Sequence, residues 1–291
     1  MQRRTACPAC HFFDSISAGT KNGFDILVCR KCRSIYTGHL PLLHEAENYD
    51  EYYNEANLTV PAFVLERVRE IINGFSDFRQ SNRLLDIGFG AGTILEIASE
   101  IGWQPFGLEV SKPAIEQART KGFQVFHGSL SEAAYPDSYF DVVTASEILE
   151  HLPDPEKDLR EIARILRPGG LLWATTPSAC SASFRVLGLD WSILCPPEHI
   201  QLYSKTGASL MLKKAGFSKT MFKTYGLNPA EIVNHFGRRS CNGKVFDRVG
   251  TGYALNETMT KGPFRKRIKG ILNLGLDITG LGDSLKIFAQ K

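Results

Sequence analysis

The chain lacks any long apolar run. No stretch of about 18 consecutive apolar residues occurs among its 291 residues, so the sequence predicts no membrane-spanning helix. Arg3 and Arg4 stand near the start, but no apolar segment follows them, and this excludes a signal peptide of the usual kind. We therefore expect a cytoplasmic protein.

The sequence also lacks internal repeats, low-complexity segments and a strong net charge. The formal net charge is +3, which is too small to indicate nucleic-acid binding by itself. Hydrophobic residues make up 43% and charged residues 22% of the chain, as is usual for a globular protein. This length and composition suit one sizeable α/β core with a smaller appendage.

The seven cysteines do not form a disulfide framework, because their number is odd and their spacing is uneven. Four of them form two C-x-x-C pairs separated by residues 11–28, which is the spacing of a zinc ribbon; they are Cys7, Cys10, Cys29 and Cys32. A segment this short has little core, so a bound zinc ion would supply its folding free energy. We predict a structural Cys₄ zinc ribbon over residues 1–40, with redox-active or incidental cysteines as the alternative.

From residue 83 onward, strand-like and helix-like segments alternate, which predicts an α/β fold with a mainly parallel, Rossmann-like seven-stranded sheet and helices on both faces. Residues 41–82 read as a helical cap before this domain, which spans 83–291 with an insertion at 226–283 that could cover a substrate pocket. The predicted strands are 84–87, 105–109, 124–127, 139–145, 170–175, 220–225 and 284–289, and the helices are 93–101, 113–121, 154–166 and 204–215.

A glycine-rich loop follows the first strand of this domain. Gly88, Gly90 and Gly92 form G-x-G-x-G, which lets the backbone approach a ligand closely before a helix begins. Asp86, at the end of the strand, could orient this loop or bind an amino group of the ligand. Glu109 ends the second strand, where an acid can bind both hydroxyls of a ribose. The alternatives are a tight turn without a ligand and a solvated carboxylate.

Three later segments resemble motifs of class I S-adenosylmethionine-dependent methyltransferases: Phe140–Leu152, Leu166–Leu172 (LRPGGLL) and Lys214–Phe217 (KAGF). The resemblance covers residues 84–225 in the expected order. It implies that the methionine part of the cofactor lies over Asp86–Gly92 and Ser146, and the ribose on Glu109. The adenine would lie near Gly128, Ser129 and Leu130, although this family often has an acid where this chain has Ser129.

The segment after the fourth strand carries Glu147, Glu150 and His151, which can share one face of a helical turn. Together with Pro196-Pro197-Glu198-His199, it resembles ubiquinone-pathway O-methyltransferases. That resemblance implies a possible divalent-cation site formed by the two acids, His151 and His199. The alternative is that His151 acts as a general base or orders its loop without a metal.

Two further features leave alternatives open. Tyr49, Tyr52 and Tyr53 could lie over the cofactor or pack the cap on the sheet. Residues 238–269 hold nine basic and two acidic residues, and an apolar stripe overlaps the end of this run: Ile268, Ile271, Leu272 and Leu276. A basic amphipathic helix could meet RNA, a phosphorylated substrate or an anionic membrane as a peripheral contact. More commonly the stripe packs on the protein's own core, and this is our expectation.

These observations predict an S-adenosylmethionine-dependent methyltransferase with a structural zinc ion and a small-molecule acceptor, most consistent with O-methylation of a sugar, a quinone-like compound or another natural product. An enzyme that modifies RNA through the zinc ribbon and the basic run is the second hypothesis. A cofactor-binding scaffold without catalysis is the third. The sequence does not indicate the oligomeric state.

Overall fold

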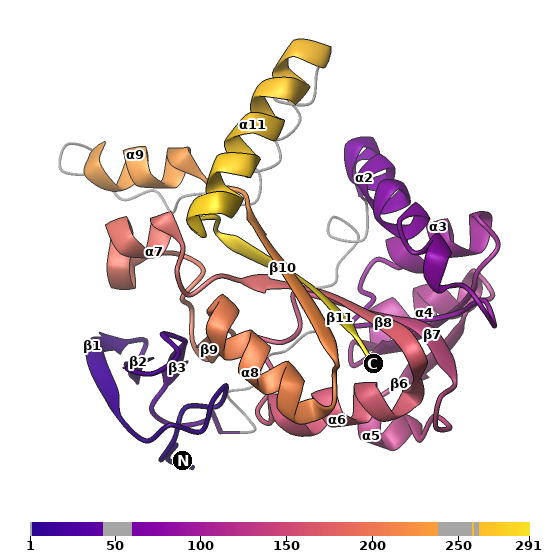
Figure 1. Cartoon of the computed structure of the whole chain (residues 1–291), viewed down its shortest axis with the longest axis horizontal. Helices are drawn as coiled ribbons and strands as arrows, with labels where there is room; N and C mark the ends of the chain where they lie inside the picture. Colours follow the sequence, from indigo (N-terminus) through magenta and orange to yellow (C-terminus); the bar gives the residue numbers. More distant parts are fainter. Residues whose placement is uncertain (1, 43–59, 238–257, 259–261) are drawn as a thin grey trace. The chain divides into compact units, whose positions relative to one another are not determined.

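The computed structural model describes residues 2–42, 60–237, 258 and 262–291 (Figure 1). Tyr49, Tyr52 and Tyr53 and most of the basic run lie outside the described residues. The chain divides into two compact units. The first unit comprises residues 1–40, 177–207 and 222–286, and the second comprises 41–176, 208–221 and 287–291. None of the described helices is both long and apolar enough to cross a membrane.

The first unit contains an antiparallel four-stranded sheet in the order β1-β2-β3-β9 (β1 Ser15–Lys21, β2 Phe24–Cys29, β3 Ile35–Thr37 and β9 Gln201–Leu202). Asn22 and Gly23 join β1 to β2 with positive φ angles of 50° and 82°, as a two-residue hairpin turn of type I′ requires. In β9, Leu202 pairs with Ile35 of β3. The fourth strand of this small sheet therefore comes from residues far along the chain.

The core of the first unit also joins distant segments. Phe24, Ile26 and Ile35 from the small sheet are buried together with Leu187 and Trp191. Leu187 is the last residue of α7 (Ala182–Leu187). Trp191 directly follows a 3₁₀ turn, η2 (Gly188–Asp190). The cysteine-bearing segment is therefore part of a larger hydrophobic core that includes residues 177–207.

The seven-stranded sheet confirms the predicted α/β architecture. Its order is β10-β11-β8-β7-β4-β5-β6, and the printed pairings β7–β8, β7–β4, β4–β5 and β5–β6 are parallel. The strands are β4 Arg83–Ile87, β5 Gln104–Glu109, β6 Gln124–His127, β7 Phe140–Ser146, β8 Leu166–Pro177, β10 Lys219–Tyr225 and β11 Ser284–Gln290. Because β4 lies between β5 and β7, the order of the sheet reverses at β4, and ligands of such sheets bind where this reversal occurs.

Four helices alternate with these strands at nearly the predicted positions: α3 Thr93–Glu100, α4 Lys112–Thr120, α6 Pro155–Ile165 and α8 Lys205–Ala215. The short helix α5 (Leu130–Ala133) was not predicted. Before the sheet, α2 (Ala62–Asn73) and a 3₁₀ turn, η1 (Ser76–Phe78), occupy the region predicted as helical. Ile72 and Phe75 from this region are buried in one cluster with Trp103 and Trp173.

One strand boundary differs from the sequence prediction. Strand β8 begins at Leu166 rather than at Gly170, so the segment Arg167-Pro168-Gly169-Gly170 belongs to the strand and does not precede it. The register with β7 shifts between the pairs Phe140–Leu166 and Val142–Leu171, which indicates a bulge. Periodicity alone does not reveal this, because a bulge interrupts the alternation of side chains.

In the part of the insertion that the structure describes, α9 spans Pro229–Gly237 and α11 spans Pro263–Thr279. Our expectation that the apolar stripe of α11 packs on the core is wrong, because Ile271 is 70% exposed and Ile268 and Leu272 are also exposed. The helix instead contacts its own unit through polar side chains. Asn273 accepts a hydrogen bond from the backbone of Gly226, and Asp277 accepts one from Thr224.

Candidate functional site

The glycine loop joins β4 to α3 with a backbone that favours glycine. Gly88 and Gly92 have φ angles of 68° and 78°, in the left-handed region that side chains disfavour. A Cβ atom on Gly88 would lie 2.1 Å from Cδ1 of Ile148, whereas one on Gly92 would meet nothing within 4 Å. The turn at Gly88 therefore packs directly under the segment that carries Glu147 and Glu150.

Glu109 ends β5 and is buried, so it is not a solvated strand-end carboxylate. Its carboxylate accepts hydrogen bonds from three backbone amides: those of Gly90 at 3.0 Å, Val110 at 2.7 Å and Ser111 at 3.1 Å. Glu109 thus links the second strand to the glycine loop. The acid is held firmly at the edge of the sheet where the strand order reverses.

Asp86 is also buried, next to the same loop. Burial raises the pKa of its carboxyl group to about 7, and the negative charge of Glu109 adds to this effect. Thr144 on the neighbouring strand β7 opposes the shift by donating a hydrogen bond of 2.7 Å to Asp86. A cationic group of a ligand placed beside Asp86 would favour its ionised form.

The loop after β6 contains the predicted adenine contacts. Ser129 is the N-cap of α5, and Leu130 is buried at the first position of this helix. The hydroxyl of Ser129 donates to Glu132 at 2.6 Å, and the backbone amide of Ser129 donates to the same oxygen at 2.8 Å. Glu132 was missed by the sequence analysis, although the spacing S-x-x-E is the signature of a capping box. Its carboxylate lies beside residue 129, where the family often has an acid.

Strand β7 ends at Ser146, whose hydroxyl lies 2.9 Å from that of Thr175 on β8. The next residue, Glu147, has a φ of 55° and donates its backbone amide to the carbonyl of Thr175 at 2.8 Å. A left-handed conformation is uncommon for a residue other than glycine, and such strain is concentrated at functional sites. The strand therefore ends in a strained turn that leaves the side chain of Glu147 exposed.

Glu150 is fully buried in the same segment, while the neighbouring His151 is partly exposed. Thr176 donates a hydrogen bond of 2.9 Å to one carboxyl oxygen of Glu150, and the other oxygen lies 4.0 Å from Nε2 of His151. Burial and the charge of Glu147 raise the pKa of Glu150 well above its usual range. A buried carboxyl beside an imidazole can share a proton with it.

His199 belongs to the first unit, whereas Glu147, Glu150 and His151 belong to the second. Nδ1 of His199 lies 2.6 Å from the carbonyl oxygen of Ile193 and therefore donates to it. In the neutral ring this leaves Nε2 as the nitrogen with an acceptor lone pair. His199 is thus oriented by its own loop.

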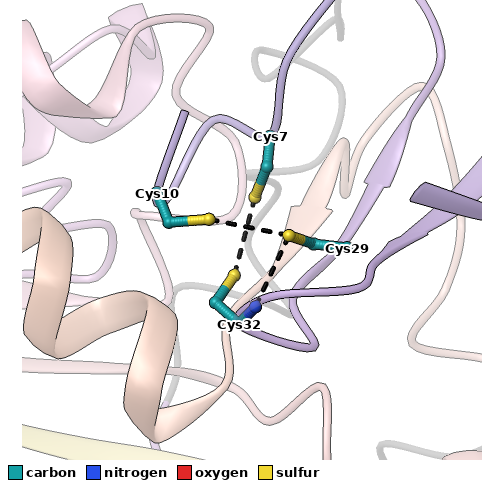
Figure 2. Close-up of side chains that lie close together, drawn as sticks. All are labelled: Cys7, Cys10, Cys29 and Cys32. Carbon is teal, nitrogen blue, oxygen red and sulfur yellow. Dashed lines mark hydrogen bonds between the residues drawn. The ribbon is translucent and has the colours of Figure 1, made fainter. Parts of the chain in front are cut away.

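The four predicted cysteine ligands lie together in the first unit, where they are buried (Figure 2). The sulfur atoms of Cys7 and Cys32 are 3.6 Å apart, as are those of Cys10 and Cys29, so these cysteines are not disulfide-bonded. All four sulfur atoms lie within 4.8 Å of one another. Zn–S bonds of about 2.3 Å in a tetrahedron place sulfur atoms about 3.8 Å apart. The cluster therefore fits a Cys₄ metal site.

Comparison with known proteins identifies the family to which residues 60–220 belong. The family model described as a methyltransferase domain matches residues 60–220, which is more than half of the chain. The chain belongs to this methyltransferase family. Within it, the glycine loop, Asp86 and Glu109 are the elements that the class I resemblance assigns to S-adenosylmethionine.

Individual relatives match parts of this methyltransferase. The chain is 29% identical over 168 residues to a ubiquinone biosynthesis O-methyltransferase of Aromatoleum aromaticum, a match that covers 53% of this chain and 72% of that protein. It is 33% identical over 130 residues to 27-O-demethylrifamycin SV methyltransferase of Amycolatopsis mediterranei, a match that covers 42% of this chain and 47% of that protein. A crystal structure of a SAM-dependent methyltransferase from Archaeoglobus fulgidus shares the fold, with a TM-score of 0.55 and 20% identity over 84% of this chain and all of that one.

Proposed function

We propose that this methyltransferase transfers a methyl group from S-adenosylmethionine to a hydroxyl group of a small biosynthetic intermediate. The observation that carries the proposal is the pairing of two sites in the second unit. Asp86 and Glu109 lie beside the glycine loop, and Glu147, Glu150 and His151 follow the adjacent strand. The first site suits the cofactor, and the second suits removal of a proton from an acceptor.

The residues that would hold the cofactor are Asp86, Gly88, Gly90, Gly92, Glu109, Ser129, Leu130 and Ser146. Asp86 would pair with the ammonium group and Glu109 with the ribose hydroxyls, while the glycines leave room for the ligand against the backbone. The bound cofactor supplies an electrophilic methyl group on a positively charged sulfur. Methyl transfer breaks the bond from carbon to sulfur and forms one from carbon to oxygen, giving S-adenosylhomocysteine.

The acceptor hydroxyl must lose its proton as this bond forms. We assign the proton to Nε2 of His151, because a partly exposed imidazole can reach a ligand and its neutral ring nitrogen can accept a proton. Once His151 is protonated, its positive charge favours the ionised form of the Glu150 carboxyl 4.0 Å away and so opposes the effect of burial on that group. Alternatively, Glu147, Glu150 and His151 would hold a divalent cation that acidifies the hydroxyl.

Product analysis tests this proposal. Protein with methyl-labelled S-adenosylmethionine is offered catechols, hydroquinones, sugars, amines and RNA, and label is expected on a hydroxyl oxygen of a small molecule. His151→Gln should lower kcat by about 100-fold with little change in cofactor affinity, since general-base catalysis contributes about 10²–10⁴-fold. Lys219→Gln, a change at an exposed position on β10, is the control.

The outcomes separate the hypotheses. Label on RNA would support the second hypothesis, and cofactor binding without any turnover would support a scaffold. If removal of weakly bound divalent cations by EDTA abolishes activity and magnesium restores it, the cation has the role that we assign to His151 as a base.

We further propose that Cys7, Cys10, Cys29 and Cys32 bind one structural zinc ion. The sulfur spacing supports this, and four thiolates leave no open position for a substrate. Metal analysis should find about one zinc per chain. Cys29→Ser should reduce this content, whereas Cys180→Ser, outside the cluster, should leave it unchanged.

A further inference from the structure

Helix α11 exposes an apolar face to solvent. Phe264, Ile271 and Ile278 recur along one side of the helix and are 74%, 70% and 77% exposed. We call this side, with its exposed neighbours, the α11 apolar face: Phe264, Ile268, Ile271, Leu272, Leu274 and Ile278. A helix of 17 residues extends for about 25 Å, so the face is long as well as apolar. Contiguous apolar surface of this kind marks an interaction site.

The opposite side of α11 attaches the helix to its own unit. Asn273 and Asp277 are four residues apart and therefore share a side. Asn273 accepts from the backbone of Gly226 at 3.1 Å, and Asp277 accepts from Thr224 at 2.8 Å and from Lys205 at 3.3 Å. The polar side faces the protein and the apolar side faces solvent, which reverses the usual arrangement of a surface helix.

Basic side chains border the α11 apolar face. Leu272 and Leu274 form the two edges of the face. Arg265 lies seven residues, or about two helical turns, before Leu272 and therefore on the same side of the helix as that edge. Arg267 lies seven residues before Leu274, on the side of the other edge. The two arginines therefore lie along opposite borders of the face. Asp277, the one acidic residue of the helix, is engaged by Lys205 and Thr224. An apolar stripe between cationic borders is the pattern of helices that lie in the surface of an anionic membrane.

We propose that α11 docks this protein on anionic lipid surfaces, with the α11 apolar face inserted at the boundary between headgroups and acyl chains. A second copy of the chain fits this face less well, because α11 offers no acid to pair with the arginines of a partner helix: its one acid, Asp277, is engaged by Lys205 and Thr224. RNA would engage the arginines but would leave the apolar side chains exposed to water. The inference does not depend on the identity of the methyl acceptor.

Vesicle flotation with the full-length protein tests this inference. Binding is expected to vesicles of phosphatidylcholine with about 30% phosphatidylglycerol, to be weaker with phosphatidylcholine alone, and to decrease as salt is raised. The double variant Ile271→Asp/Ile278→Asp should lower the partition coefficient by more than about tenfold. Arg265→Gln/Arg267→Gln should do the same, because each arginine near an anionic surface contributes about fivefold.

Matched controls are available on β10. Lys219→Gln/Lys223→Gln removes the same charge from exposed positions, and Met221→Asp places one acid at an exposed apolar position. Both variants should keep the partition coefficient within about twofold of the unsubstituted protein, because the substituted side chains lie outside the α11 apolar face and alter only the overall charge. Equal losses in control and α11 variants would overturn the proposal, because binding would then reflect overall charge.

A second measurement does not depend on comparing affinities. Trp103, Trp173 and Trp191 are buried, so a tryptophan placed by Ile271→Trp would dominate any change in fluorescence on docking. Its emission should shift to the blue with anionic vesicles. An unshifted emission, or a dimer in sedimentation analysis that Ile271→Asp/Ile278→Asp dissociates without any lipid binding, would assign the face to another partner and refute the proposal.

Discussion

At the scale of single residues, Asp86 combines a buried carboxyl group with a proposed role toward a cation. Its pKa of about 7 means that the group is half protonated near neutral pH when no ligand is bound. If the ionised form pairs with the ammonium group of the cofactor, affinity should increase from pH 6 to pH 8 by up to about tenfold per unit below the pKa. Calorimetry with S-adenosylhomocysteine measures this dependence. The variant Asp86→Asn should bind S-adenosylhomocysteine weakly, and its affinity should not depend on pH over this range.

The same shift affects stability with a definite sign. The pKa of Asp86 is raised in the folded state, so its contribution is complete below about pH 4 and is lost as pH rises to about 7. Ligand-free protein should therefore become less stable across this range, by up to about 4 kcal/mol from this group. In thermal unfolding, Asp86→Asn should lose less stability than the unsubstituted chain over the same range. Parallel pH profiles would show that Asp86 does not titrate as described.

Gly88 connects the cofactor loop with the proposed proton-handling segment. In Gly88→Ala, the new Cβ would displace Ile148, and the segment from Glu147 to His151 would have to shift with it. We expect kcat/KM to decrease by more than about tenfold, since small displacements of catalytic groups have large effects on rate. Gly122→Ala is the control, because Gly122 has a similar φ of 80° with nothing within 4 Å of an added Cβ. Equal effects of both substitutions would indicate backbone strain alone.

At the scale of elements, the start of α8 approaches the cysteine cluster too closely for a side chain. A Cβ atom on Gly207 would lie 2.2 Å from the hydroxyl of Ser34 and 3.3 Å from the sulfur of Cys32. Gly207→Ala should therefore weaken metal retention in a competition assay with a chromogenic chelator, and should lower stability by about 1–3 kcal/mol through overpacking. Gly270→Ala in α11 meets nothing within 4 Å and should be neutral or slightly stabilising. Unchanged metal retention in Gly207→Ala would contradict this prediction.

The elements also show what sequence patterns can predict. Strands such as Gln124–His127 were predicted to the residue, because β-branched or aromatic residues between turn signals favour one short extended segment. Strand β9 has two residues, and its pairing with β3 depends on tertiary contacts that leave no periodic signal. The exposure of Ile271 could not be predicted either, because an amphipathic pattern does not reveal which side of a helix faces the protein.

The candidate site was predictable to a similar degree. Asp86, the glycines and Glu109 follow from a local motif and from strand ends that meet at one edge of a parallel sheet. The left-handed backbone of Glu147 and the raised pKa of Glu150 depend on burial and on hydrogen bonds from β8, such as that from Thr176. Those properties are set by packing between strands and cannot be read from one segment of sequence.

At the scale of the whole molecule, the cysteine-bearing segment does not have a core of its own. Phe24, Ile26 and Ile35 share their cluster with Leu187 and Trp191, and β9 completes the small sheet. The metal site and residues 177–207 therefore belong to one cooperative unit, so the loss of a bound ion should destabilise both. In hydrogen exchange with and without a strong zinc chelator, faster exchange is expected in residues 15–37 and also in 182–202. Exchange in β4 and β5, whose cores lie in the second unit, should change little. If the faster exchange is confined to residues 15–37, the segment is an independent module, and residues 177–207 fold without it.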